Sequence, residues 1–229
     1  IPVELLNLLK EFDLAFENFE LILFKINRGL AASLNELIDL IIQNGSFEFI
    51  ARMDADDISH LTRLEKQVVY FKDNPKVSIC GTSCREFGAS FAKNEKHLPV
   101  SHQELLDFSI TRCPFIHPTV MFRASVFVNG TYYPVDTTLT EDMALWFELL
   151  EKGYKFGNIN EILLDYRLNE NTIDRRKGLS KAMSEIKIRV KYMFILKRVT
   201  PRNIVLIAAR IVFHLMPSKL VKLAYKFAR

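Results

Sequence analysis

The chain is poor in cysteine, and its three cysteines form no CxxC pair. Such a set offers neither a disulfide framework nor the spacing of a zinc site, so we expect a protein of a reducing compartment. No signal peptide, internal repeat or low-complexity linker is visible in the sequence. The longest apolar run, Ile204 to Met216, is interrupted by Arg210 and His214 and is too short to span a bilayer.

Acidic residues are almost absent from the C-terminal quarter. Residues 175–229 hold 15 Lys or Arg and one acid, Glu185, whereas residues 1–174 hold 16 basic and 26 acidic side chains. We therefore divide the chain into an acidic body, residues 1–174, and a basic helical segment, residues 175–229. A basic segment of this kind indicates an anionic partner: a membrane surface, nucleic acid, or the acidic body itself.

The last residues of the basic segment favour a lipid surface. Lys219, Lys222, Lys226 and Arg229 are spaced 3, 4 and 3 apart, so they would line one face of a helix that starts near Pro217. This pattern is typical of an interfacial helix on anionic lipid, and docking onto the acidic body is the alternative. Nucleic acid is disfavoured because the sequence has no basic motif interleaved with aromatic residues.

The predicted elements alternate between strands and helices. Phe19 to Ile26 is strand-like, Leu30 to Ile41 has helical spacing, and Phe47 to Met53 is a second strand. This order predicts an α/β fold with a parallel sheet and right-handed crossovers. Further strands are expected at 77–81, 119–123 and 162–167, and further helices from Ser59 to Asp73, after the Ser101/Glu104 capping box, and from Glu141 to Lys152 behind Thr140.

Three carboxylates come directly after the second strand: Asp54, Asp56 and Asp57. Like charges this close repel unless a cation or solvent neutralises them, and Mg²⁺ or Mn²⁺ prefers such oxygen ligands. Ligands of α/β sheets bind beyond the carboxyl ends of strands, which is where these side chains lie. We therefore predict a metal–phosphate site, with a solvated Asp-rich turn as the alternative.

Three other clusters are candidates on weaker grounds. Glu141 and Asp142 open a helix, where the macrodipole favours carboxylates, so simple helix capping explains them. The same macrodipole would keep Asp142 ionised, as a general base requires. His117 is expected to open a strand, and it has either a structural or surface role or a ligand or acceptor-contact role. Arg175 and Arg176 form a solvated charge run or a clamp for a diphosphate.

Taken together, these segments resemble the family 2 glycosyltransferases, and within them the bacterial exopolysaccharide, capsule and lipopolysaccharide subgroup that includes the amylovoran-biosynthesis enzymes. The resemblance runs in order over about residues 20–180. It is carried by the segments Asn27–Asn35, Phe49–Ser59, Arg63–Gln67, His117–Arg123, Thr140–Trp146, Tyr166–Arg167 and Arg175–Gly178.

The resemblance implies a GT-A fold, with a mostly parallel sheet flanked by helices, and an inverting sugar transfer. It implies that Asp142 is the general base and that Asp56 holds Mn²⁺ or Mg²⁺ on the diphosphate of a nucleotide sugar, with a UDP-sugar as the first expectation. Asp54 would bind the donor by facing either its ribose or the metal. It further implies donor contacts from Asn27, Arg52, Arg175 and Arg176, and acceptor or accessory roles for Glu141, His117 and Asp57.

The same resemblance implies a lipid-linked or oligosaccharide acceptor and no nucleic-acid partner. The expected location is the cytoplasm, peripheral to the cytoplasmic face of the inner membrane. A metal nuclease or phosphotransferase would also use clustered carboxylates, but the Asn27–Leu34 and His117–Arg123 segments argue against it. Trp146 shares a helix face with Asp142 and is expected in the core.

Two positions depart from the family pattern. Leu61 stands where the family usually has proline, and the first strand–helix–strand, which holds the nucleotide base, is not found before Val3. We therefore expect an N-terminally truncated GT-A domain. The alternative to an active enzyme is a catalytically inactive remnant that retains membrane or partner binding.

Overall fold

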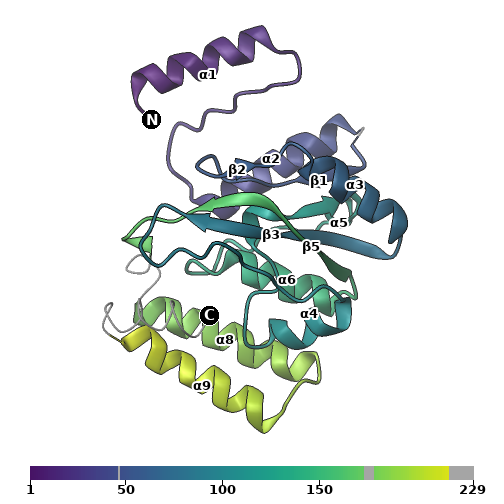
Figure 1. The fold of residues 1–229 in the computed structure, drawn as a ribbon, viewed down its shortest axis with the longest axis vertical. Helices are drawn as coiled ribbons and strands as arrows, with labels where there is room; N and C mark the ends of the chain where they lie inside the picture. Colours follow the sequence, from purple (N-terminus) through teal and green to yellow (C-terminus); the bar gives the residue numbers. More distant parts are fainter. Residues whose placement is uncertain (46, 173–177, 217–229) are drawn as a thin grey trace.

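The computed structural model describes residues 1–45, 47–172 and 178–216, and of 211–215 the backbone alone. Its centre is a mixed, five-stranded, curled sheet with the strand order β1-β4-β3-β5-β2 (Figure 1). The strands are β1 (Phe49–Ala51), β2 (Ile58–Ser59), β3 (Val77–Phe87), β4 (Met121–Arg123) and β5 (Lys155–Arg167).

The expectation of a mostly parallel sheet is wrong. Of the four strand pairings formed by the described residues, β3 with β5 is parallel, whereas β1–β4, β3–β4 and β2–β5 are antiparallel. An apolar run indicates a buried strand, but it does not indicate whether that strand runs parallel or antiparallel to its neighbours. The α/β class itself is confirmed.

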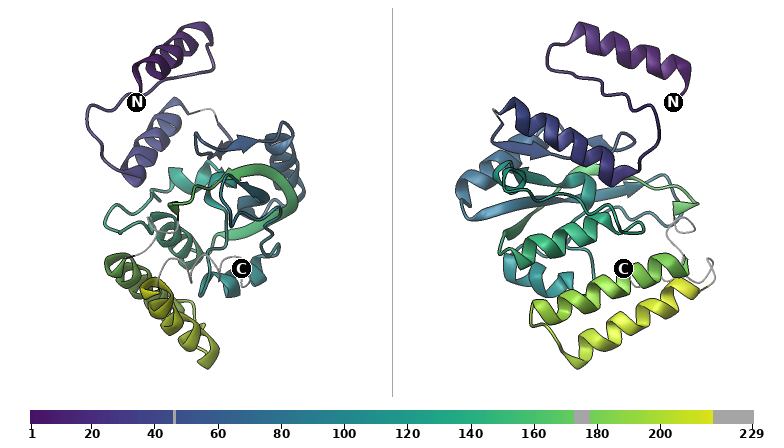
Figure 2. Two further views of the ribbon diagram at one scale, coloured as in Figure 1. Left: turned by 60° about the vertical axis from the view of Figure 1, so that its left-hand side comes forward. Right: turned by 180° about the vertical axis from the view of Figure 1, so that it is seen from behind.

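Helices cover both faces of the sheet. The face that carries Cys80 and Met121 packs against Phe71 of α3 (Arg63–Asp73). The opposite face belongs to the larger core, to which α2, α4, α5 and α6 contribute side chains (Figure 2). The last two helices lie side by side at the end of the molecule farthest from α1. The helices are α1 (Val3–Ala15), α2 (Leu30–Asn44), α3 (Arg63–Asp73), α4 (His102–Ser109), α5 (Ser125–Val128), α6 (Glu141–Glu151), α8 (Leu179–Ile195) and α9 (Pro201–Leu215).

Trp146 is the centre of the larger core, as expected. Its side chain is fully buried, and its ring centroid lies 5.0 Å from that of Phe115 and 5.8 Å from that of Phe122. These rings come from α6, from the segment before η1 (His117–Thr119) and from β4. Aromatic packing therefore fixes the start of α6, where Asp142 lies, against the sheet.

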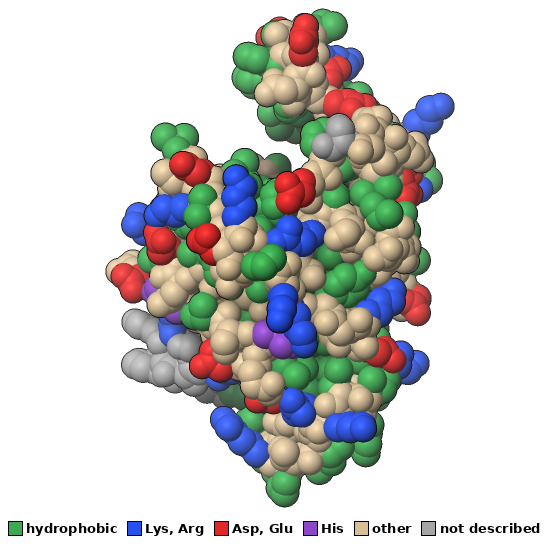
Figure 3. Space-filling model, turned by 90° about the vertical axis from the view of Figure 1, so that its right-hand side faces the viewer, with side chains coloured by type: hydrophobic (Ala, Val, Ile, Leu, Met, Phe, Trp, Pro, Cys, Tyr) green, Lys and Arg blue, Asp and Glu red, His purple; other side chains and the backbone are tan. Residues whose placement is uncertain are grey.

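The segment from Phe19 to Ile26 is not a strand, contrary to the sequence prediction. It runs as an irregular connection between α1 and α2, with Leu23 and Ile26 exposed, and the described residues offer it no pairing strand. Strand propensity alone does not form a strand, because the backbone needs a hydrogen-bonded neighbour. Helix α1 has no buried residue and stands apart from the sheet and the other helices, with apolar side chains on its surface (Figure 3).

Several predicted boundaries change in the structure. Ser59 lies in β2, opposite Leu164, and α3 begins only after Thr62. His117 opens the one-turn helix η1 instead of a strand, because Pro118 fixes a φ that suits a helical first turn and has no N–H for a ladder. The predicted capping box of Ser101 and the helix behind Thr140 are confirmed.

The described part of the basic segment is helical, as predicted. It forms α8 and α9, whereas Lys219, Lys222, Lys226 and Arg229 lie outside the described residues. None of the helices in the described ranges combines the length and the apolar character needed to cross a bilayer.

Candidate active site

The acidic loop after β1 brings its three carboxylates together. One oxygen each of Asp54, Asp56 and Asp57 lies within 4.8 Å of the others. Asp57 is buried, Asp54 is half-buried and Asp56 is exposed, so the cluster opens to solvent on one side. A cation that already carries another ligand can therefore reach these carboxylates from the solvent.

Two arginines hold the loop in shape. The guanidinium of Arg52 donates two hydrogen bonds to the carboxylate of Asp54, including Nη1 to Oδ2 at 2.9 Å. At the end of β5, the Arg167 N–H donates to Asp57 Oδ1 and its Nε donates to the Asp56 carbonyl, both at 2.8 Å. Arg167 belongs to the Tyr166–Arg167 motif, but nothing in its local sequence indicates that it supports this loop.

Asp57 loses its proton less readily than an ordinary carboxyl group. Burial raises its pKa to about 6, and the charges of Asp54 and Asp56 act in the same direction, against the hydrogen bond from the Arg167 N–H. Its second oxygen, Oδ2, has no hydrogen-bond partner within the described part of the chain. A buried, unpartnered carboxylate oxygen beside two further carboxylates is a donor set that fits a hard divalent cation.

Arg63 joins this loop to the turn that carries His117. Its buried guanidinium donates from Nη1 to the Pro118 carbonyl at 2.7 Å and to the Arg52 carbonyl at 3.4 Å. The side chain of Gln67, one turn later, donates to the Cys80 and Thr119 carbonyls. The Arg63–Gln67 motif therefore positions the site from beneath instead of contacting a ligand.

Asp142 lies in the first turn of α6 and is partly exposed. Its Oδ1 accepts a hydrogen bond from the Met143 N–H at 2.7 Å, and its Oδ2 lies 3.8 Å from the Cys113 Sγ. Burial and the charge of Asp142 raise the pKa of Cys113 to about 12, so the thiol stays protonated and donates. The carboxylate is thus oriented while its remaining lone pairs stay free for a proton.

Tyr133 and His117 occupy the space between the acidic loop and α6. The Tyr133 hydroxyl and His117 Nε2 are 2.9 Å apart. Burial and the nearby Arg52 charge lower the pKa of His117 to about 3, so the ring is neutral; the Asp142 charge opposes this shift. Burial also raises the pKa of Tyr133, and the charges of Arg52, Asp142 and Asp54 all reach its hydroxyl. The predicted metal ligand Asp54 and the predicted base Asp142 therefore both lie near the Tyr133 hydroxyl.

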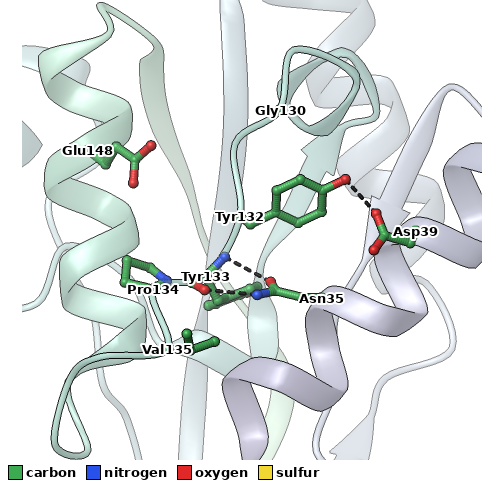
Figure 4. Close-up of a pocket in the computed structure, with 8 residues that line it drawn as sticks. All are labelled: Asn35, Asp39, Gly130, Tyr132, Tyr133, Pro134, Val135 and Glu148. Atoms are coloured by element: carbon green, nitrogen blue, oxygen red, sulfur yellow. Dashed lines mark hydrogen bonds between the residues drawn. The ribbon is translucent and has the colours of Figure 1, made fainter.

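Asn35 of α2 holds the backbone of Tyr133 from the other side. Its side chain donates to the Tyr133 carbonyl and accepts from the Tyr133 N–H, both at 2.9 Å (Figure 4). Asn35 ends the Asn27–Asn35 motif, but its partner lies 98 residues away. Sequence reasoning therefore missed Tyr133, because no local spacing connects it with Asn35.

Tyr133 lines two separate hollows. One is a shallow surface pocket of about 590 Å³, which Asn35, Asp39 and Glu148 help to line. The other is a mostly apolar cavity of about 160 Å³ between α2 and β1, with Arg52 and Tyr133 at its polar end. A ligand in either hollow would contact Tyr133.

One predicted donor contact, Asn27, lies apart from this cluster. The Asn27 side chain accepts a hydrogen bond from the Gly29 N–H at 3.0 Å and so shapes the turn before α2. None of the described contacts joins Asn27 to the acidic loop. Arg175 and Arg176 lie outside the described residues.

The sequence profile described as Glycosyl transferase family 2 matches residues 4–129, more than half of the chain. An uncharacterized glycosyltransferase of Haemophilus influenzae is 32% identical over 205 residues, which cover 87% of this chain and 73% of the relative. The chain belongs to the family 2 glycosyltransferases.

Two further relatives have more specific names. The amylovoran biosynthesis glycosyltransferase AmsE of Erwinia amylovora is 27% identical, over 87% of this chain and 73% of its own length. A UDP-Gal:alpha-D-GlcNAc-diphosphoundecaprenol beta-1,3-galactosyltransferase of Escherichia coli is 31% identical, over 72% of this chain and 59% of its own length.

Solved structures support a GT-A-like fold. Staphylococcus aureus TarS 1–349 in complex with UDP-GlcNAc superposes with a TM-score of 0.61 at 12% identity, over 92% of this chain and 60% of that one. The mannosyltransferase PcManGT of Pyrobaculum calidifontis in complex with GDP-Man and Mn²⁺ gives a TM-score of 0.51 at 13% identity, over 97% of this chain and 72% of that one. At these identities the likeness concerns the fold alone.

Proposed function

We propose that this chain transfers a sugar, with inversion, from a nucleotide-diphosphate sugar to a glycan acceptor in the biosynthesis of a surface polysaccharide. The observation that carries the proposal is the acidic loop, in which three carboxylates lie within 4.8 Å and the buried Asp57 Oδ2 has no partner among the described residues. The names of the relatives support the same chemistry, since they act in amylovoran biosynthesis or on a diphosphoundecaprenol-linked sugar.

The acidic loop would receive the donor diphosphate. Asp54 and Asp56 would hold Mn²⁺ or Mg²⁺, which would offset the charge that develops on the leaving diphosphate. Asp57 completes the oxygen set, and the two hydrogen bonds from Arg52 keep Asp54 in one orientation. A UDP-sugar is the first donor to test, because TarS 1–349 was crystallised with UDP-GlcNAc and the galactosyltransferase is named for UDP-Gal.

Asp142 would be the general base. Its carboxylate is partly exposed, lies at the positive end of α6 and is oriented by the Met143 N–H and the Cys113 thiol. It would take the proton of the acceptor hydroxyl as that oxygen attacks the anomeric carbon from the face opposite the leaving diphosphate. The product would then have the anomeric configuration opposite to that of the donor.

Neutral His117 and Glu141 would border the acceptor. His117 stays uncharged at neutral pH, so it can hydrogen-bond a sugar hydroxyl without competing with Asp142 for the proton. A lipid-linked acceptor matches the diphosphoundecaprenol in the galactosyltransferase's name, and such an acceptor would place the reaction at the cytoplasmic face of the membrane.

The test is sugar transfer by the purified chain in Mn²⁺, with UDP-, GDP- and dTDP-sugars and a diphosphoundecaprenol-linked sugar acceptor. We expect Asp142→Asn to lower kcat by about 10²- to 10⁴-fold, the usual contribution of a general base. The matched control is Glu151→Gln, an exposed carboxylate in the last turn of the same helix, which should keep wild-type kcat.

Retention of full activity by Asp142→Asn would exclude it as the base. A product that keeps the donor's anomeric configuration would exclude inversion. If no donor is turned over and no nucleotide diphosphate binds with Mn²⁺, the chain is the catalytically inactive alternative.

A further inference from the structure

One face of α8 is exposed and combines apolar with basic side chains. Met183, Lys187, Val190, Lys191 and Phe194 are spaced 4, 3, 1 and 3 apart, so they lie on the same side of the helix. Met183 is 56% exposed and Phe194 is 62% exposed. The opposite side of α8 is buried against the body and α9, so this exposure is not that of a frayed helix.

The pattern continues into the turn between α8 and α9. Lys197 and Val199 of this turn are exposed, as are Arg202 and Val205 near the start of α9, and Val205 is 66% exposed. Both helices lie at the end of the molecule farthest from α1 (Figures 1 and 2). We call the set from Met183 to Phe194 together with these four residues the α8–α9 face.

The α8–α9 face itself contains no carboxylate. From Gly178 to Arg210 the sequence contains one acid, Glu185. Glu185 is buried, its Oε1 lying 2.8 Å from Arg189 Nε and 3.2 Å from Arg210 Nη1. The nine residues of the α8–α9 face are therefore all apolar or cationic. The carboxylates described next to it are Glu148 and Glu151 of α6, which lie near Tyr192, the ring that the Lys191 Nζ overlies at 4.8 Å.

We propose that the α8–α9 face docks flat onto an anionic lipid bilayer. Phe194, Val190 and Met183 would enter the boundary between headgroups and acyl chains. Lys187 and Lys191 would lay their apolar stems along the same surface and keep their ammonium groups at the lipid phosphates. Each such cation near an anionic membrane strengthens the attraction.

A second copy of the chain fits this face less well. Symmetric pairing places the same patch on both sides of the interface, so the lysines and Arg202 of one copy would meet those of the other. With Glu185 buried, the described part of the face offers them no carboxylate, and like charges would repel. An anionic bilayer supplies the missing charge over a wide, flat area.

The proposal is independent of the sugar transfer, and it concerns other residues than the basic tail at 217–229. The test is flotation of the full chain with phosphatidylcholine vesicles, with and without 30% phosphatidylglycerol. We expect binding to the anionic vesicles only, reduced at least about tenfold by Phe194→Asp and about fivefold or more by Lys187→Glu with Lys191→Glu.

The matched control is Leu61→Asp. Leu61 is fully exposed on the turn before α3, so this variant changes an exposed leucine elsewhere and should float like the wild type. Circular dichroism establishes that each variant is folded. As a second measurement, Phe194→Trp should show a blue-shifted emission with anionic vesicles, against the constant signal of the buried Trp146.

Four outcomes would overturn the proposal. The wild type could fail to float, or float equally on neutral vesicles. Binding could persist in folded Phe194→Asp yet be lost when Lys219, Lys222 and Lys226 are changed to Glu, which would assign it to the tail. Light scattering could show a dimer that Phe194→Asp dissociates, which would assign the face to a second copy.

Discussion

Stability of the metal-free chain and metal binding favour opposite protonation states of Asp57. Its folded pKa, about 6, lies above its ordinary value of 3.8 because of burial. Protonation therefore favours the folded chain: this stabilisation is complete below about pH 4 and is lost as the pH rises through 6. At pH 8 the folded, metal-free protein carries a buried charge that the unfolded chain does not bury.

Asp57→Asn should accordingly stabilise the metal-free chain at pH 8 by about 1–3 kcal/mol and have less effect at pH 5. Urea unfolding in EDTA measures both values, with the exposed Asp136→Asn as a control that should stay within about 0.5 kcal/mol. Added Mn²⁺ should raise the midpoint of the wild type more than that of Asp57→Asn. A variant that is destabilised at pH 8 would show that the carboxylate is satisfied without a cation.

The hydroxyl of Tyr133 should matter more for catalysis than for folding. Tyr133→Phe removes the 2.9 Å hydrogen bond to His117, and a lost bond of this kind costs about 1 kcal/mol of stability. We expect kcat to fall about tenfold, with a donor KM close to that of the wild type, because His117 loses its fixed orientation beside Asp142.

The neighbouring residue supplies the comparison. The Tyr132 hydroxyl donates to Asp39 on the surface, so Tyr132→Phe removes a phenolic hydrogen bond outside the proposed chemistry. Steady-state kinetics of the two variants, with unfolding measured in parallel, separate the roles. Equal kcat values for Tyr133→Phe and Tyr132→Phe would mean that the His117 contact is only structural.

At the scale of elements, α8 is anchored to α4 by buried hydrogen bonds from an arginine. Arg189 Nη1 donates to the Ser109 and Ile110 carbonyls at 2.8 and 3.0 Å, and Arg210 donates to the Thr111 carbonyl. These carbonyls lie at the C-terminal end of α4, where the helix leaves its acceptors unpaired and favours cations. Part of the basic segment thus binds the body itself, one of the alternatives that its charge had left open.

Arg189→Met should destabilise the chain by about 2–4 kcal/mol, because it leaves two buried carbonyls unpaired and Glu185 with less compensation. Arg198→Met is the comparison. It breaks a more exposed ion pair with Asp107, between α4 and the turn that follows α8, and should cost under about 1 kcal/mol. Chemical denaturation measures both, and similar costs would contradict the role assigned to Arg189.

The helices that the sequence predicted well share a clear apolar period and a local stop or start. Leu34, Ile38 and Ile41 recur at helical spacing in α2, and Gly45 ends it in the left-handed conformation. Phe19 to Ile26 has equal strand character, but it lacks a neighbour to pair with. The period of a segment is local information, whereas strand formation depends on a partner elsewhere in the chain.

At the scale of the whole molecule, the sequence located the acidic loop and Asp142 but not what lies between them. Tyr133 is held by Asn35 from 98 residues away, and Arg167 supports the Asp57 carboxylate from 110 residues away. No spacing rule connects such positions, since they meet only through the strand order of the sheet. The antiparallel pairings of β1, β2 and β4 could not be predicted from the sequence for the same reason.

The central claim is that the acidic loop binds a nucleotide diphosphate through a divalent cation. Isothermal titration of UDP into the wild type, Asp56→Asn and Asp136→Asn, each in Mn²⁺ and in EDTA, tests it most directly. We predict UDP binding only with Mn²⁺, weakened at least about tenfold in Asp56→Asn and unchanged in Asp136→Asn. Absent binding, equal affinity in EDTA, or wild-type affinity in Asp56→Asn would contradict the account.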